Sequence, residues 1–245
     1  MKKQISLFLA LTALSFNLLA DAHSDFVAGE ILYDQNRPSE ALTTFIEAAK
    51  AGSVDAQNRV GTMYAKGIGT DTNYDHALIW FRTAAKNDHP EAIYNVGKMY
   101  QLGLGMEKNP TIAIQWYTHA LALDSAEAAN NLADMYLKGS AVEQNTEKAK
   151  ALFVQAAELG SAVAQRNLGF LYFNGKGIKQ DMNESYFWFD IAASNHYPDA
   201  AHYRDFIASK LTPKNLAKQQ QRASDWLTQR EDKPKSNVPN NITAS

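Results

Sequence analysis

The sequence predicts an all-α fold in which about six antiparallel pairs of helices stack into a solenoid. Three observations predict it. Residues of one type recur every 36 positions along most of the 245-residue chain, which is the signature of a repeat array. Within each unit the apolar residues lie three and four positions apart, the spacing of an amphipathic helix and not of a strand. With 45% hydrophobic residues and 7 prolines, the composition is that of a globular chain.

The repeated positions divide each unit into two helices. The first helix carries an alanine near its start, at Ala56, Ala92, Ala128, Ala164 and Ala200, and a tyrosine near its end, at Tyr64, Tyr100, Tyr136 and Tyr172. The second helix carries bulky residues followed by alanine, as at Trp80, Phe81 and Ala84. We expect the alanines to allow close packing of neighbouring helices and the aromatic side chains to fill the space between them.

The expected helix ends carry the residues that helix ends need. An acceptor side chain that can bond the free amides of a first turn precedes each second helix, at Asn73, Asn109, Asn145 and Asp181. First helices begin after Ser53, Ser125 and Ser161, or with a proline at the first helical position, at Pro90 and Pro198. Second helices end at residues that tolerate a left-handed backbone, namely Gly52, Asp88, Asp124, Gly160 and His196.

The pattern Ala-x4-Gly-x2-Tyr-x2-Gly-x-Gly, followed by Ala-x2-Trp-aromatic-x2-Ala-Ala, resembles the Sel-one-like repeat family, a relative of the tetratricopeptide repeats. The departures from it include Ala133 in place of the glycine of the first helix, Ala141 in place of the second loop glycine, Leu152 in place of the tryptophan and Leu121 in place of the last alanine. The resemblance implies a right-handed α-solenoid whose first helices line the concave side. It also implies binding of a protein or peptide partner rather than catalysis.

We expect three regions along the chain. Residues 1–22 form a signal peptide, residues 23–228 the solenoid and residues 229–245 a disordered tail. The solenoid begins with a short unit at 26–54, and the four full units that follow are 55–90, 91–126, 127–162 and 163–198. Residues 199–228 form a C-terminal cap, in which Trp226 and Leu227 cover the apolar face of the last unit.

The N-terminus has the pattern of a secretory signal peptide. Two lysines lie within the first four residues, and the run from Ile5 to Ala20 has no charge. Ala20-Asp21-Ala22 offers a cleavage site after Ala22, and cleavage after Ala20 is the alternative. An uncleaved anchor is also an interpretation, but the run is shorter than the ~20 residues that span a bilayer. We expect a periplasmic or secreted protein of a Gram-negative bacterium, without a stable membrane anchor after cleavage.

The residues give no support for catalysis, metal binding or nucleic-acid binding. There is no cysteine, and 24 basic residues face 26 acidic ones, so thiolate zinc sites and the positive surplus of nucleic-acid-binding domains are missing. The Ser-x-x-Lys, Lys-Thr-Gly and Gly-x-Ser-x-Gly motifs of serine hydrolases are absent. Residues 71–82 begin like a calcium loop but have His76 and Arg82 where glycine and glutamate are required. We therefore expect no enzyme activity, metal or cofactor.

The variable positions of the first helices are the candidate partner-binding surface. If these helices line a concave groove, one column of side chains projects into it at Asn58, Tyr94, Asn130 and Arg166. The next turn adds Thr62, Lys98, Asp134 and Phe170. Asn58 and Asn130 can bond the backbone of an extended peptide, Arg166 can pair with a carboxylate, and Tyr94, expected to be exposed, can act as an anchor. The alternative is an ordinary solvated surface.

Phe170 and Phe173 differ from this column of polar residues. The corresponding residues of an earlier unit are Lys98 and Gln101. We expect the two phenylalanines to seat the C-terminal cap, and an apolar patch for a partner is the alternative.

Two functions follow from these features. The preferred one is a monomeric, non-enzymatic exported adaptor that binds a protein or peptide through the concave surface. The alternative is a cell-wall accessory protein or weak hydrolase that acts on peptidoglycan or β-lactam-type substrates. For this alternative the sequence offers a location but no catalytic group.

Overall fold

The computed structural model describes residues 22–231, which contain twelve helices and no strand. The all-α prediction is therefore confirmed. The first helix, α1, is described over 22–34. It is followed by α2 (Pro38–Lys50), α3 (Val54–Lys66), α4 (Tyr74–Ala85), α5 (Pro90–Leu102), α6 (Pro110–Ala122), α7 (Ala126–Lys138), α8 (Thr146–Glu158), α9 (Ala162–Asn174), α10 (Met182–Ser194), α11 (Ala200–Ala208) and α12 (Pro213–Glu231). Most of the predicted signal peptide and tail, at 1–21 and 232–245, lies outside the described residues.

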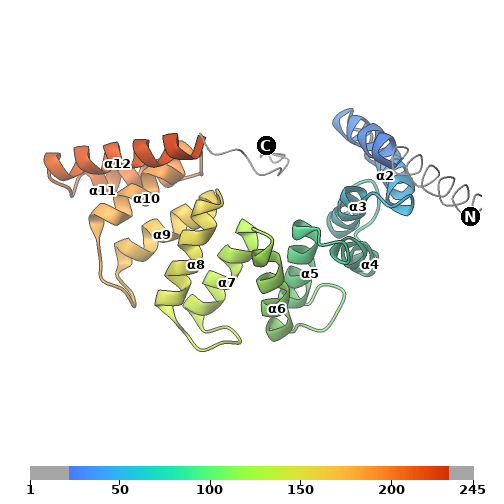
Figure 1. The fold of residues 1–245 in the computed structure, drawn as a ribbon, viewed down its shortest axis with the longest axis horizontal. Coiled ribbons are helices and arrows are strands. Elements are labelled where there is room, and N and C mark those ends of the chain that lie inside the picture. Colours follow the sequence, from blue (N-terminus) through green and yellow to red (C-terminus); the bar gives the residue numbers. More distant parts are fainter. Residues whose placement is uncertain (1–21, 232–245) are drawn as a thin grey trace, which may run out of the picture.

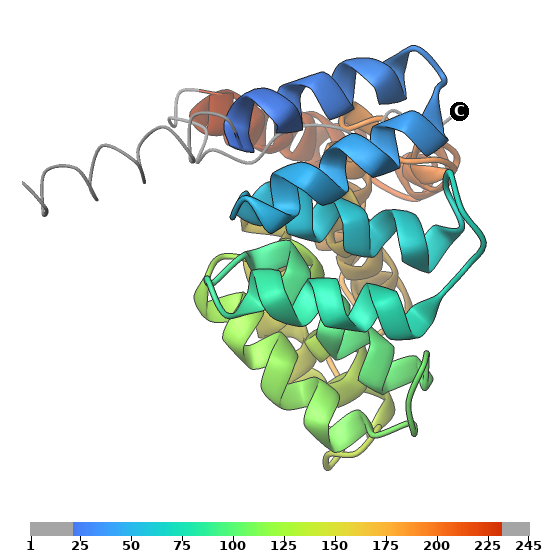
Figure 2. The ribbon, with the colours of Figure 1, turned by 90° about the vertical axis from the view of Figure 1, so that its right-hand side faces the viewer.

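The helices stack in chain order into a curved array, with α2 near one end and α12 near the other (Figure 1). Consecutive helices pack against each other, so that α3 pairs with α4, α5 with α6, α7 with α8 and α9 with α10. Viewed from the side, the pairs follow one another as successive layers (Figure 2). The predicted solenoid of stacked helix pairs is confirmed.

Side chains cap the helices as the sequence predicts. Acceptors precede the second helix of all four full units, 2.8–3.1 Å from a backbone nitrogen of the first turn: Asn73, Asn109, Asn145 and Asp181. Serine Oγ atoms accept in the same way at 3.2 Å, from Ser53, Ser125 and Ser161. At α5 the cap is His89, whose Nδ1 accepts from the backbone N–H of Ala92 at 3.3 Å, ahead of Pro90. Each cap satisfies an amide that the helix itself leaves unpaired.

The turns after the second helices have the predicted left-handed backbone. Their φ angles are 104° at Gly52, 54° at Asp88, 61° at Asp124, 102° at Gly160 and 56° at His196. The turn after α10 also contains the one helix start that the sequence mispredicts.

Pro198 is not the first residue of α11. It lies in a turn closed by a bond of 3.3 Å from the Ala200 N–H to the Tyr197 carbonyl. Asp199, the third residue of this turn, has φ 65° and ψ −12°. Proline followed by a residue with positive φ is the sequence of a type II turn, so α11 starts two residues later than Pro90 predicts for α5.

The core of the described residues is divided among neighbouring repeats. Phe81 of α4, for example, packs with Val96 and Met99 of α5, and separate clusters follow along the array. Gly61 of α3 lies close to the aromatic ring of Phe81 on α4, because a Cβ at Gly61 would be 2.7 Å from that ring. Each repeat therefore depends on its neighbours for burial, as expected of a solenoid.

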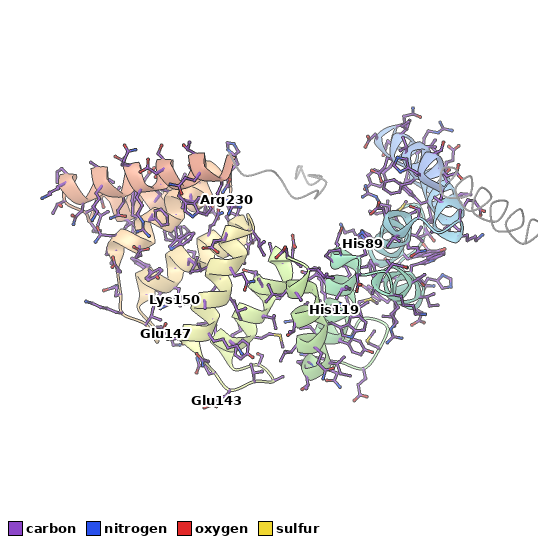
Figure 3. All side chains as sticks on the ribbon, in the orientation of Figure 1. His89, His119, Glu143, Glu147, Lys150 and Arg230 are labelled. Carbon is purple, nitrogen blue, oxygen red and sulfur yellow. The ribbon has the colours of Figure 1, made fainter. Side chains whose placement is uncertain are left out.

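The last helix, α12, covers the outside of the final full unit. It packs against α10, where the ring centroids of Trp226 and Trp188 are 6.0 Å apart. Trp226 and Leu227 both join the apolar cluster that includes Phe187. Near the end of α12, Arg230 donates to the last carbonyl of α8 (Figure 3). Trp226 and Leu227 thus contact the last full unit, and α12 continues past the expected end of the cap at residue 228.

Candidate partner-binding surface

Asn58, on α3, is buried and joins two repeats. Only 7% of it is exposed. Its Nδ2 donates to Oε2 of Glu91 at 3.0 Å, and its Oδ1 accepts from Nδ2 of Asn95 at 3.5 Å. Both partners belong to α5. The expectation that this carboxamide is free for a peptide is therefore wrong, because the next repeat already uses both ends of it.

Tyr94, on α5, is half-buried, which corrects the expectation that it is exposed. Its ring centroid is 5.6 Å from that of Tyr117 on α6. Its hydroxyl accepts from Nδ2 of Asn131 at 3.4 Å. Burial raises the pKa of Tyr94. The side chain packs between repeats, because the second helix behind it places another aromatic ring against it.

Tyr117 connects this part of the surface to the core. It has no exposed surface. Its hydroxyl donates to Oε1 of Gln101 at 2.6 Å and accepts from Nδ2 of Asn131 at 3.1 Å. Burial raises the pKa of Tyr117, so the group is a neutral hydroxyl. The bonds fix the orientation of the Asn131 carboxamide.

Asparagine recurs on successive first helices at Asn95, Asn131 and Asn167, and we call these three residues the asparagine ladder. Each Nδ2 donates to a side chain of the preceding repeat, and for Asn167 the acceptor is Oδ1 of Asn130 at 3.1 Å. No group in residues 22–231 donates to the three Oδ1 atoms, so each keeps a free acceptor. In the sequence these three asparagines recur at intervals of 36 residues. The predicted binding residues were instead those at positions whose residue type varies from repeat to repeat.

The position that precedes the ladder in the first full unit is Arg59. Its guanidinium donates to both carboxylate oxygens of Glu30 at 2.8 and 2.6 Å and lies 5.4 Å from the ring centroid of Tyr33. Arg59 therefore fastens α1 to α3, and the ladder begins at α5.

Arg166, on α9, is held by aromatic rings. Its guanidinium carbon is 4.6 Å from the ring centroid of Phe170 and 5.7 Å from that of Tyr197. Its Nε is buried and has no hydrogen-bond partner in residues 22–231. The side chain is half-buried and has no acceptor within the described chain.

The remaining polar candidates lie one turn further along the same helices. Lys98 is exposed, and Thr62 is half-buried. Asp134 is half-buried and forms an ion pair of 2.6 Å with Lys138. Binding of a partner by these residues stays a prediction.

Phe170 and Phe173 contact α11, as expected from the preferred interpretation of the sequence. The Phe170 ring is 4.9 Å from Phe189 and 4.6 Å from Tyr203, in edge-to-face contacts. The Phe173 ring is 6.1 Å from Phe206. Phe206 itself is 46% exposed. The two phenylalanines therefore seat α11, and part of the aromatic cluster faces solvent.

His89 and His119, which are labelled in Figure 3, each lie close to an aspartate. Nε2 of His89 is 3.3 Å from Oδ1 of Asp55, and Nε2 of His119 is 3.3 Å from Oδ1 of Asp88. The bond from His89 lowers the pKa of Asp55. Residues 22–231 hold no group of three or more histidine, aspartate or glutamate side chains able to bind a metal ion.

A hollow of about 760 Å³ lies where α12 crosses α8 and α10. Phe187, Trp188 and Trp226 form its apolar wall. Arg222 lies 3.8 Å above the Phe187 ring and pairs with Glu184. None of the residues that line the hollow is a serine, a cysteine or a histidine. In the described part of the chain no helix is long and apolar enough to cross a membrane.

Comparison with known proteins identifies four repeats. The Sel1 repeat model matches residues 54–89, 90–125, 126–161 and 162–197. No curated protein matches the chain. Among solved structures, a Sel1 repeat protein from Oxalobacter formigenes is 28% identical with a TM-score of 0.70, over 86% of this chain and 87% of that one.

Two further structures share the fold. A protective antigen present in uropathogenic Escherichia coli strains, which displays an SLR fold, is 27% identical with a TM-score of 0.74 and covers 91% of this chain and 50% of its own. An immunity protein from Pseudomonas aeruginosa is 21% identical with a TM-score of 0.57, over 89% of this chain and 85% of that one. The last likeness concerns the fold alone.

Proposed function

Because the chain belongs to the Sel1 repeat family, whose members are generally protein-interaction scaffolds, we propose that it is a non-enzymatic adaptor for a protein or peptide partner. The partner binds to the face of the first helices, which forms the concave surface of the array. The adaptor acts as a monomer.

The observation that carries this proposal is the asparagine ladder. Its Nδ2 atoms are bonded within the protein, so the carboxamides have a fixed direction, and their Oδ1 atoms are free to accept. The N–H groups of an extended peptide are donors that need such acceptors. A row of oriented acceptors therefore suits the main chain of a partner and is not selective for its side chains.

The ladder recurs once in each repeat along the array. A chain bound along it would therefore meet one ladder position per repeat. The neighbouring side chains of Lys98 and Asp134 differ in charge, so they add side-chain preferences at separate points.

Export is part of the proposal and rests on the residues before the array. The two lysines near Met1, the uncharged run from Ile5 to Ala20 and the Ala20-Asp21-Ala22 sequence favour secretion to the periplasm or beyond. The partner is therefore to be sought in that compartment.

The test is affinity capture from the periplasmic fraction of the native host. The variant Asn95→Ala/Asn167→Ala removes two ladder acceptors, and the matched control Gln115→Ala/Gln155→Ala removes two exposed carboxamides from α6 and α8. Partners captured by the wild-type protein should be depleted about tenfold or more with the ladder variant, as expected for loss of central contacts. The control should capture them as the wild-type protein does.

Equal capture by the two variants, with unchanged helicity by circular dichroism, would place the binding face elsewhere. The same preparation is incubated with a peptidoglycan digest and a labelled β-lactam. Turnover of either compound would contradict the non-enzymatic adaptor.

A further inference from the structure

Arg166 is a cation without a counterion in residues 22–231. No described group accepts a hydrogen bond from its guanidinium, and no described carboxylate lies within ion-pair distance. Of its nitrogens only Nε is both buried and unpaired, so the unpaired Nη groups reach solvent. Unmet donors on a half-buried cation cost free energy. An external acceptor at the Nη edge would remove part of this cost.

The rings beside Arg166 restrict how an acceptor can approach. Phe170 and Tyr197 are within cation–π distance of the guanidinium. They hold the side chain in place and displace water from it, which strengthens its attraction for an anion. The open edge of a guanidinium matches the two oxygens of a carboxylate.

The first full unit contains an internal example of such a contact. Asn58, which occupies the position of Arg166 in that unit, donates to the side-chain carboxylate of Glu91 on the next first helix. The residue that matches Glu91 after the last unit is Asp199. Asp199 lies in the turn before α11 with φ 65°, has a shorter side chain and does not pair with Arg166. The carboxylate is thus missing where the last unit presents a cation.

Exposed apolar side chains lie on α9 and α11. Val163, one turn before Arg166 on α9, is 42% exposed, and Phe206, on α11, is 46% exposed. Nζ of Lys210 lies 5.2 Å from the ring centroid of Phe206 and adds a second positive charge. The helices α9 and α11 therefore carry both exposed apolar side chains and positive charge.

We propose that Arg166 binds the side-chain carboxylate of a glutamate or aspartate in the partner, while Val163 and Phe206 contact apolar residues beside it. This inference rests on the proposed function and adds the chemistry of the partner at one point of the surface. The asparagine ladder binds the main chain, and Arg166 selects an acidic residue.

The carboxylate of a side chain is favoured over that of a chain terminus, because the surface of the array continues on both sides of Arg166. The helix α11 follows α9 and places His202 and Phe206 at the positions that match Arg166 and Phe170. A bound chain therefore has surface to follow beyond the cation. The internal example, Glu91, also supplies its carboxylate from a side chain.

The test is a selection from random peptides displayed within a loop of a carrier protein, so that they have no free terminus, with a second library that ends in a free C-terminus. Peptides selected by the purified protein should share one acidic position with apolar neighbours. Replacing that acid by its amide, or using Arg166→Gln, should each weaken binding about tenfold or more. The two changes together should weaken it no further, since both remove one interaction.

Lys66→Gln is the matched control, because it removes an exposed cation from another first helix, α3, without touching Arg166; its affinity should stay within about twofold of wild type. Arg166→Lys keeps the charge but loses the planar edge, and should bind between the wild type and Arg166→Gln. If Arg166→Gln loses helicity, the acid-to-amide peptide and Arg166→Lys decide the question.

The outcomes are distinguishable. Peptides without an acidic preference, or with equal affinity for Arg166→Gln, would overturn this inference and leave the proposed function standing. Selection only from the free C-terminus library would overturn the side-chain assignment. No selected peptide from either library would count against both proposals.

Discussion

At the scale of the residue, Tyr117 combines packing and hydrogen bonding. A Cβ at Gly97 would lie 2.9 Å from its ring, and its hydroxyl bonds Gln101 and Asn131. Tyr117→Ala should lower the free energy of unfolding by ~3–5 kcal/mol, since it leaves a cavity. Tyr117→Phe should lower it by ~0.5–1.5 kcal/mol, since only the hydroxyl is lost. Urea unfolding followed by circular dichroism measures both, and equal losses would show that the ring contributes little.

His89 caps α5 in a place where other first helices use serine. His89→Ala should lower the free energy of unfolding by ~1 kcal/mol, because the Ala92 amide loses its acceptor. His89→Ser should recover most of this loss, because a serine Oγ accepts at the same position in α3, α7 and α9. Thermal unfolding of the two variants provides the comparison. A serine variant no more stable than the alanine variant would contradict the capping role.

The bond between His89 and Asp55 makes stability depend on pH. Because this bond favours the ionised carboxyl, the pKa of Asp55 is lower in the folded chain than in the unfolded one. Its contribution is therefore complete above about pH 4 and is lost as the pH falls through the folded value. The Asp55 side chain is 70% exposed, so solvent keeps the effect small.

The change that isolates this effect is Asp55→Asn. The difference in Tm between the wild type and this variant should be largest near neutral pH and should shrink below about pH 4. Melting curves from pH 3 to pH 7 measure it. A difference that stays constant over this range would rule out the carboxylate as its source.

At the scale of the helix, α12 is held by a few large contacts. Trp226→Ala removes the contact with Trp188, and because Trp226 is half-buried the loss should be ~2 kcal/mol, below the ~3–5 kcal/mol of a fully buried aromatic residue. Gln229→Ala, an exposed position on the same helix, should change stability by no more than ~0.5 kcal/mol. Urea unfolding gives both values. A loss at Gln229 as large as that at Trp226 would mean that the contact between Trp226 and Trp188 is not what holds α12 in place.

Local signals predicted the elements, and tertiary contacts decided what local signals could not. Asn73 and Asp88 mark helix ends through bonds and backbone angles within a few residues, so their roles could be predicted from the sequence. Pro198 has the same repeat position as Pro90, but the residue after it, Asp199, adopts a positive φ and completes a turn. The sequence predicted that Trp226 covers the last unit, but no local pattern specifies its contact with Trp188 on α10.

Partner binding by the candidate surface stays a prediction. The 36-residue period placed Arg166 in one column with Asn58, Tyr94 and Asn130. It could not reveal the burial of Asn58 or Tyr94, because the tilt between successive repeats decides which partners they meet. For the same reason, the sequence did not identify the free Oδ1 acceptors of Asn95, Asn131 and Asn167, which depend on the bonds that their Nδ2 atoms form across repeats.

At the scale of the whole molecule, burial between repeats maintains the fold. The chain has no cysteine, and each apolar cluster is shared by adjacent helices. We expect the far-ultraviolet circular dichroism spectrum to be strongly helical and to stay the same in EDTA or in a reducing agent. A fall in helicity with EDTA would reveal a metal that the fold requires.

Because the core is divided into clusters, the array can bend by small amounts at several places along its length. Because no described cluster extends from one end of the array to the other, a small rotation at several junctions changes the curvature of the whole array without emptying any one cluster. The bonds of the asparagine ladder cross these same junctions, so they stretch or shorten as the array bends. A partner chain bound along the ladder would hold the array at one curvature. The length of that partner chain would set the curvature of the array.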